Sequence, residues 1–143
     1  MSELPYFRAA LARPGIAGLR RLPAAEWPTL AAAAEALGLA CVTVDLSDCD
    51  NATAALRELG KALTFPDWYG ANFDALSDCL GDFADEPARG AVLLLHGDTR
   101  LRTGDADGAA TLLEVFAAVA EARQNSLAPL WIFVPAGDLP DFP

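Results

Sequence analysis

The amino-acid sequence predicts an α/β fold in which a parallel sheet of three to four strands packs against helices. Short apolar runs alternate along the 143 residues with longer segments of helical pattern, the order that consecutive βα units produce. The segment 91–96 reads as a strand buried on both faces of a parallel sheet. A hydrophobic content of 53% offsets the entropy of ordering, and no linker or repeat divides the chain, so we expect one domain over residues 1–143.

In the N-terminal part, helix boundaries and β-branched residues mark the elements. We expect, in chain order, an irregular start at residues 1–14, a short strand at 16–22, a helix at 24–37 and a strand at 40–46. Pro5 and Pro14 break the first segment. Glu26 early in the helix and Gly38 just past its end are typical of helix boundaries. The strand after it is rich in β-branched residues.

The rest of the chain continues the alternation of helices and strands. We expect, in chain order, a turn at 48–50, a helix ending at about residue 63, a helix at 73–83, a loop at 87–90, the strand at 91–96, a charged loop at 97–108, a helix at 109–123, a last strand at 130–134 and a tail from residue 135. Asn51 or Thr53 can cap the first of these helices. The inner side of the helix at 109–123 is apolar: Leu112, Leu113, Val115, Phe116 and Val119. Right-handed crossovers would make the sheet largely parallel, in a strand order that these patterns leave open.

The charge of the chain restricts the kind of partner that it can bind. Twenty acidic residues against ten basic ones give a net charge of −10. Nucleic acid requires Lys and Arg to neutralise its phosphates, and an anionic membrane repels such a chain, so neither is an expected partner. A basic protein is expected, because opposite charges steer two molecules together over a range that salt shortens.

Cysteine usage and the apolar runs indicate the compartment. Cys41, Cys49 and Cys79 are odd in number and lack a C-x-x-C pair, which matches neither a disulfide framework nor a zinc site. We expect them to pack as small apolar side chains in a reducing cytoplasm. The N-terminus lacks the pattern of a secretory signal, and the apolar runs are too short to span a bilayer. These features predict a cytoplasmic protein.

The segment 65–80, FPDWYGANFDALSDCL, is the most informative part of the chain. It predicts an aromatic-bearing turn followed by a helix that Asn72 caps. Six acidic residues and no Lys or Arg lie between positions 67 and 86: Asp67, Asp74, Asp78, Asp82, Asp85 and Glu86. On an ideal helix the side chains of four of them lie within about 80° of one another: Asp74, Asp78, Asp82 and Asp85. The apolar residues, Cys79 among them, occupy the opposite side, which we expect to face the core.

Three interpretations of this acidic face are open. The first is a solvated surface on an acidic protein. The second is a Mg²⁺ or Ca²⁺ site on Asp74 and Asp78, which stand one turn apart, although their spacing supplies no third ligand. The third is an anionic docking surface, since Trp68 and Tyr69 precede the helix and aromatic residues beside charge are typical of interface hot spots. One of these two aromatic residues is expected to pack in the core.

Other polar motifs predict less. His96, the only histidine, follows a strand in a position that suits a general base, but no nucleophile is placed beside it and a structural role is favoured. The segment 104–108, GDADG, lacks the spacing and terminal glutamate of an EF-hand and is expected to be a solvated loop. Arg20 and Arg21 are expected at a strand edge, where they would balance the acidic surface.

The segment 65–80 resembles the signature of the barstar family, intracellular inhibitors of secreted bacterial ribonucleases of the barnase type. The resemblance is dense over PDWYGANFDALSDCL and looser from there to both sides. It implies a barstar-like core at 40–134, an added N-terminal strand and helix at 1–38 and a tail at 135–143. In this family the helix and the preceding loop plug the ribonuclease active site, with carboxylates in place of RNA phosphates.

The resemblance also implies which residues would contact the partner. Asp78 falls on the central aspartate of the family's interface and Asp74 on its neighbour one turn earlier. The remaining candidate contacts are Trp68, Tyr69, Phe83 and Asn72. No catalytic residue, cofactor or metal is implied, and the chain is expected to be an immunity or antitoxin protein, monomeric when free.

Around the two central aspartates the chain departs from the family's best-known member. Trp68 stands where that member has a tyrosine, and Phe83 stands where it has a tryptophan. Ser77 replaces a second tryptophan, and Ala118 aligns with a glutamate. These differences leave open a barstar-like module that binds a different basic protein or toxin domain. An enzyme built on the two aspartates and a metal ion is a third alternative.

Overall fold

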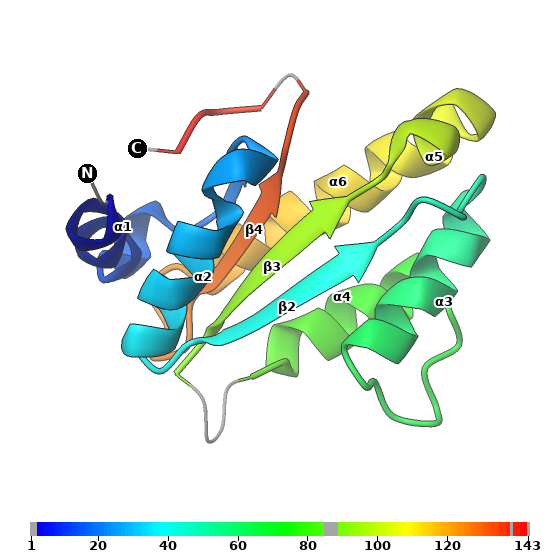
Figure 1. Cartoon of the computed structure of the whole chain (residues 1–143). Coiled ribbons are helices and arrows are strands. Elements are labelled where there is room, and N and C mark those ends of the chain that lie inside the picture. The colour runs from blue at the N-terminus through cyan, green and yellow to red at the C-terminus, as the bar shows by residue number, and fades with distance from the viewer. Residues whose placement is uncertain (1–2, 85–88, 138, 143) are drawn as a thin grey trace.

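The computed structural model describes residues 3–84, 89–137 and 139–142 and shows a four-stranded parallel sheet (Figure 1). The strands are β1 (Leu19–Arg21), β2 (Ala40–Asp45), β3 (Ala91–His96) and β4 (Leu130–Val134), in the spatial order β1-β4-β3-β2. One row of the register runs across all four strands: Leu19, Ile132, Leu93 and Val42. The predicted α/β class with a parallel sheet is therefore confirmed.

Helices cover both faces of this sheet (Figure 1). On one face lie α1 (Leu4–Leu11) and α2 (Trp27–Ala36). The short 3₁₀ turns η1 (Pro14–Ile16) and η2 (Ala24–Glu26) lie between these two helices along the chain. On the other face lie α3 (Ala52–Ala62), α4 (Phe73–Asp82) and α6 (Ala106–Ala122), with α5 (Thr99–Gly104) packed against α6. Residues 1–38 thus supply an edge strand and the helices of one layer.

Alternation along the central strands divides the core between the two layers. Leu93 and Ile132 pack on the side of α3, α4 and α6, whereas Val92, Leu94 and Trp131 pack on the side of α1 and α2. Successive side chains of a strand point to opposite faces, so a strand covered on both faces is apolar throughout. Fully burying each large apolar side chain contributes roughly 1.5–3 kcal/mol, which holds both layers on the sheet.

The irregular start predicted for residues 1–14 is wrong, because α1 forms there. Pro5 lies in the first turn of α1, where its missing N–H removes no helical hydrogen bond. Phe7 and Leu11 then repeat one turn apart and are buried. Two prolines close together suggested a break, whereas the first of them lies within the first turn of the helix.

The charged loop predicted for 97–108 is also largely wrong, because α5 and the start of α6 occupy it. Asp105 explains the difference: its Oδ1 accepts a hydrogen bond from the N–H of Gly108 at 3.0 Å, which caps α6. Its Oδ2 accepts one from the N–H of Ala52 at 2.8 Å, at the first turn of α3. One carboxylate therefore satisfies free donors at the N-termini of two helices.

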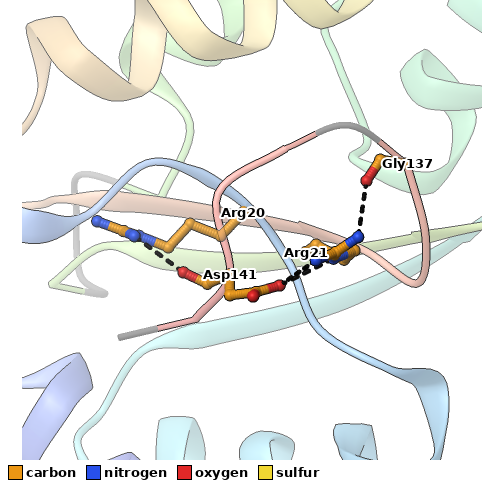
Figure 2. A network of polar contacts seen from close by, with 4 residues as sticks. All are labelled: Arg20, Arg21, Gly137 and Asp141. Carbon is orange, nitrogen blue, oxygen red and sulfur yellow. Dashed lines mark hydrogen bonds and ion pairs between the residues drawn. The ribbon is translucent and has the colours of Figure 1, made fainter.

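The outer edge of β1 is covered by the C-terminal tail (Figure 2). The N–H of Arg21 donates to Pro140 O at 2.7 Å, and the N–H of Phe142 donates back to Arg21 O at 3.1 Å. The Arg21 guanidinium binds Asp141 Oδ1 at 2.7 Å, and Arg20 Nη1 donates to Asp141 O at 3.1 Å. Both arginines lie at a strand edge as predicted, but they hold the tail, and their described contacts are not with the acidic helix.

Three further outcomes concern residues outside the described ranges, membrane-spanning helices and the ends of the remaining elements. Asp85, Glu86 and part of the loop at 87–90 lie outside the described residues. Within the described ranges, no helix is both long enough and apolar enough to cross a membrane. The remaining helices and strands lie where the sequence predicts them, with ends shifted by a few residues.

Candidate protein-binding site

Local sequence explains why α4 begins where it does. The Oδ1 atom of Asn72 accepts a hydrogen bond from the N–H of Ala75 at 2.8 Å, so Asn72 is the N-cap, as predicted. Asp74 follows in the first turn, where the positive end of the helix dipole favours a carboxylate. The start of the acidic helix is therefore set by residues that also belong to the candidate site.

α4 has one buried side and one solvent-facing side. The buried side chains are those of Ala75, Leu76, Cys79 and Leu80, and Leu76 and Leu80 join the core under the sheet. The solvent-facing residues are Asp74, Ser77, Asp78, Gly81 and Asp82. Neither the Asp74 nor the Asp78 carboxylate forms a hydrogen bond or ion pair with any residue that the structure describes. The helix is anchored by its apolar side, and the carboxylates of Asp74 and Asp78 have no partner among the described residues.

A buried arginine holds the opposite end of α4. Arg123 Nη1 donates to Leu80 O at 2.7 Å and to Phe83 O at 2.8 Å, and Arg123 Nε donates to Ala128 O at 2.8 Å. The first two acceptors are carbonyls at the C-terminus of α4, where a cation also meets the negative end of the helix dipole. Sequence reasoning missed this residue. The available signal was a lone arginine at the end of an otherwise apolar and acidic helix.

The loop before α4 is fixed by Tyr69. Its Oη donates to Leu56 O on α3 at 2.7 Å, and its ring meets the ring of Phe65 edge-on at a centroid distance of 4.9 Å. Burial, with a smaller contribution from Cys79, raises the pKa of Tyr69 to about 12. A Cβ atom at Gly60 would lie 2.6 Å from Tyr69 Cε2, so the ring lies directly over the glycine. Tyr69 is thus the aromatic residue of the pair that packs inward.

Trp68, its neighbour, points the other way. It is 65% exposed, whereas most large apolar side chains of the chain are buried. Phe83, at the C-cap of α4, is half-buried and lies 6.4 Å from the Phe65 ring centroid. The structure therefore places Trp68 in solvent beside the acidic helix, and Tyr69 and Phe83 in support of the loop and helix ends.

Two of the positions that differ from the family's best-known member meet at one groove. This groove, of about 360 Å³, lies between α4 and α6. Its walls are Ser77, Gly81, Ala118, Val119, Ala122 and Arg123. Small side chains at Ser77 and Ala118 leave this groove open, one residue along the chain from Asp78.

The other candidate groups have the following geometry. Within the described ranges, no cluster of three His, Cys, Asp or Glu residues stands close enough together to hold a metal ion. His96 Nδ1 lies 3.8 Å from Asp45 Oδ1, beyond hydrogen-bond range, and the pKa of Asp45 is lowered mainly by hydrogen bonds from Ser47. Cys49 and Cys79 are buried as predicted, whereas Cys41 is exposed.

The fold and the site together define an acidic α/β domain that presents one carboxylate-rich helix to solvent. The chain belongs to the barstar family, because residues 39–135 match the family described as "Barstar (barnase inhibitor)". This match confirms the resemblance seen in the segment 65–80 and includes the whole of α4.

Individual proteins extend the comparison. The chain is 41% identical over 46 residues to the Bacillus subtilis (strain 168) protein named "Putative ribonuclease inhibitor YrdF", an overlap of 32% of this chain and 50% of that protein. It therefore spans about half the length of this curated relative. A solved structure, "Structure of the Aeropyrum Pernix ORC2 protein (ADPNP-ADP complexes)", superposes with a TM-score of 0.58 at 16% identity, over 92% of this chain and 40% of that chain. The second likeness is one of fold.

Proposed function

We propose that the chain is a protein inhibitor of a barnase-type bacterial ribonuclease and that α4 and its preceding loop occlude the active site. Asp78 is the central anchor, Asp74 the second carboxylate and Trp68 the aromatic contact. Asn72, Tyr69 and Phe83 hold the loop and helix in shape or contact the rim. The action is stoichiometric, needs no cofactor and takes place in the cytoplasm, with a chain that is monomeric when free.

One observation carries this proposal. Asp74 and Asp78 lie one turn apart on a helix whose buried side and both ends are anchored, yet no described residue neutralises them. Like charges at this spacing repel by about a few tenths of a kcal/mol, so the arrangement does not serve the stability of the helix. An external cationic partner gives it a use.

The chemistry of a ribonuclease site fits such a surface. That site holds RNA phosphates with Arg, Lys and His, and carboxylates can accept the same charge-assisted, often bidentate, hydrogen bonds. The net charge of −10 would accelerate encounter with a basic enzyme in a way that salt weakens. Membership of the barstar family and the name of the Bacillus relative support a ribonuclease as the target.

The test is a titration of a barnase-type ribonuclease with this protein, following RNA cleavage at low and at physiological salt. We expect stoichiometric inhibition by the wild type and a loss of affinity of about a hundredfold or more for Asp78→Ala, in the range measured for buried charge pairs in complexes, the barnase–barstar pair among them. Asp48→Ala is the control, because Asp48 is also exposed but lies in the turn after β2. Equal inhibition by wild type and Asp78→Ala would refute the assignment.

A second candidate function is binding of a different basic protein or toxin domain. The groove at Ser77 and Ala118 favours it, since bulkier groups at these two positions would fill the groove. Absence of inhibition at either salt concentration would support this candidate. If Ser77→Trp combined with Ala118→Glu then creates inhibition, the two small residues account for the change of partner.

A further inference from the structure

A second groove lies on the other side of the loop, between α3 and the residues that lead into α4. It encloses about 710 Å³, and we call it the α3 groove. α3 supplies Arg57, Gly60 and Lys61 to its walls, and the loop supplies Phe65, Tyr69 and Ala71. Ala71 immediately precedes Asn72, the N-cap of α4, so the α3 groove reaches the N-terminal end of the acidic helix.

The α3 groove carries the opposite charge to α4. Arg57 and Lys61 lie one turn apart on α3 and are both exposed. Among the described residues the Arg57 guanidinium forms no ion pair or hydrogen bond, and Lys61 Nζ comes only within 3.9 Å of Glu58 Oε2. A like-charge pair at this spacing again works against the helix that carries it. As with the two aspartates, an external partner of opposite charge gives these two cations a use.

The walls of the groove are held in a defined shape. The Tyr69 ring is fixed between Gly60 and Phe65 and bonded to Leu56 O at 2.7 Å. Thr64 and Ala71, which also line the groove, have left-handed backbone conformations with φ of 55° and 52°. Such conformations in residues other than glycine persist where the surroundings impose them, and they concentrate at binding sites.

We propose that the α3 groove binds a carboxylate-bearing segment of the same protein partner whose basic residues α4 binds. The inference rests on the proposed function and deepens it, because it makes the binding face bipolar. Charge complementarity selects the occupant: two cations without strong internal partners face a groove with aromatic walls. A chain of phosphates is disfavoured relative to a single carboxylate, because it carries more negative charge past Asp67 and Asp74, which flank the groove along the chain. Opposite charges on adjacent parts of one face also fix the orientation of the partner.

The first experiment needs no ribonuclease. A short N-acetylated oligoglutamate peptide is titrated into the full chain while the backbone amide signals are followed by NMR. We expect saturable shifts at Gly60, Gly70 and Ala71. Lys61 is the only lysine, so carbodiimide coupling at this residue is a second readout. Mass spectrometry should find the peptide joined to Lys61 by an amide bond between Nζ and a glutamate carboxyl group. The carbodiimide activates that carboxyl group and takes up the water that amide formation formally releases.

Matched variants isolate the groove. Arg57→Gln should weaken peptide binding about tenfold, whereas Arg100→Gln, which removes an equal charge from exposed α5, should leave it unchanged. Lys61→Arg should keep the amide shifts and lose the cross-link. Shifts elsewhere on the protein, or equal loss with Arg57→Gln and Arg100→Gln, would overturn the proposal.

A second experiment separates this inference from the proposed function. Arg57→Glu with Lys61→Glu moves the net charge from −10 to −14, since each reversal subtracts two charges. Long-range steering alone would then improve inhibition of a basic ribonuclease, as we expect for the control Arg13→Glu with Arg100→Glu. The proposal instead predicts inhibition weakened about tenfold by the groove variant. If the groove variant inhibits as well as the control, the inference is refuted while the Asp78→Ala result stands. If the wild type does not inhibit, the proposed function fails and the peptide experiment decides the groove.

Discussion

Arg123 Nη1 lies 2.7 Å from the carbonyl oxygen of Leu80, so the C-terminus of α6 is bonded to the C-terminus of α4. The same guanidinium also bonds Phe83 O and Ala128 O, and its side chain is buried. Together with the Asn72 cap at the other end, this contact fixes the direction in which the acidic helix presents its carboxylates.

Arg123→Ala should therefore be strongly destabilising. It removes charge-assisted hydrogen bonds and leaves buried carbonyl oxygens without this donor, which we expect to cost about 3–5 kcal/mol of the free energy of unfolding. Urea denaturation followed by circular dichroism measures the change. Arg100→Ala, on the exposed side of α5, should stay within about 0.5 kcal/mol of the wild type. A loss below about 1 kcal/mol for Arg123→Ala would contradict this role.

Gly60 of α3 and Gly81 of α4 should respond in opposite ways to replacement by alanine. Alanine normally stabilises a helix interior by about 1 kcal/mol relative to glycine. At Gly81 of α4 a Cβ atom meets nothing within 4 Å, so Gly81→Ala should give that gain. At Gly60 of α3 the Cβ atom would lie 2.6 Å from Tyr69 Cε2, so Gly60→Ala must displace the ring and should destabilise the protein. Thermal unfolding of both variants tests the pair, and a stabilised Gly60→Ala would show that Tyr69 is free to move.

Tyr69 predicts a loss of stability in alkali. Its pKa is raised from 10.0 to about 12 by burial, so the folded state keeps the proton that the unfolded state releases. Below pH 10 the stabilising contribution of the protonated phenol is complete. As the pH rises from 10 towards 12 the unfolded state binds fewer protons than the folded state, and the free energy of unfolding falls.

Tyr69→Phe tests this sign. The variant lacks the hydrogen bond to Leu56 O and should be less stable at neutral pH by about 1 kcal/mol. It should also lose stability less steeply than the wild type above pH 10, where only the wild type has a phenol at this position to ionise. Denaturation curves at several alkaline pH values provide the measurement. Parallel slopes for the two proteins would mean that the phenol ionises equally easily in both states.

The fold class and the start of the acidic helix could be predicted because both depend on local patterns. An uninterrupted apolar segment identified β3, and Asn72, a residue type that favours the N-cap, identified the start of α4. The start of α1 was missed because proline was taken as a break, although it is well tolerated in a first turn. A proline can either break a helix or lie in its first turn, and only the packing of the segment decides between these two structures.

The residues that hold the site in place could not be predicted, because their partners are remote in sequence. Asp105 caps α3 from a distance of 53 positions, and Arg123 reaches Leu80 across 43. The α3 groove likewise joins a helix to a loop through Tyr69, which the sequence identified only as an aromatic residue beside charge. Pairings of this kind depend on the strand order, which the patterns left open.

The N-terminal layer offers the last prediction, about how residues 1–38 relate to the rest of the fold. Leu30 of α2 is fully buried and packs in one cluster with Val92, Leu94, Trp131 and Phe133 of the central strands. If this layer unfolds with the sheet, Leu30→Ala should lower the free energy of global unfolding by about 2–5 kcal/mol in a single transition. Leu127→Ala is the control, since Leu127 is 95% exposed. An unchanged main transition in Leu30→Ala, or a separate early one, would instead mean that α1 and α2 form an appendage whose loss the barstar-like core survives.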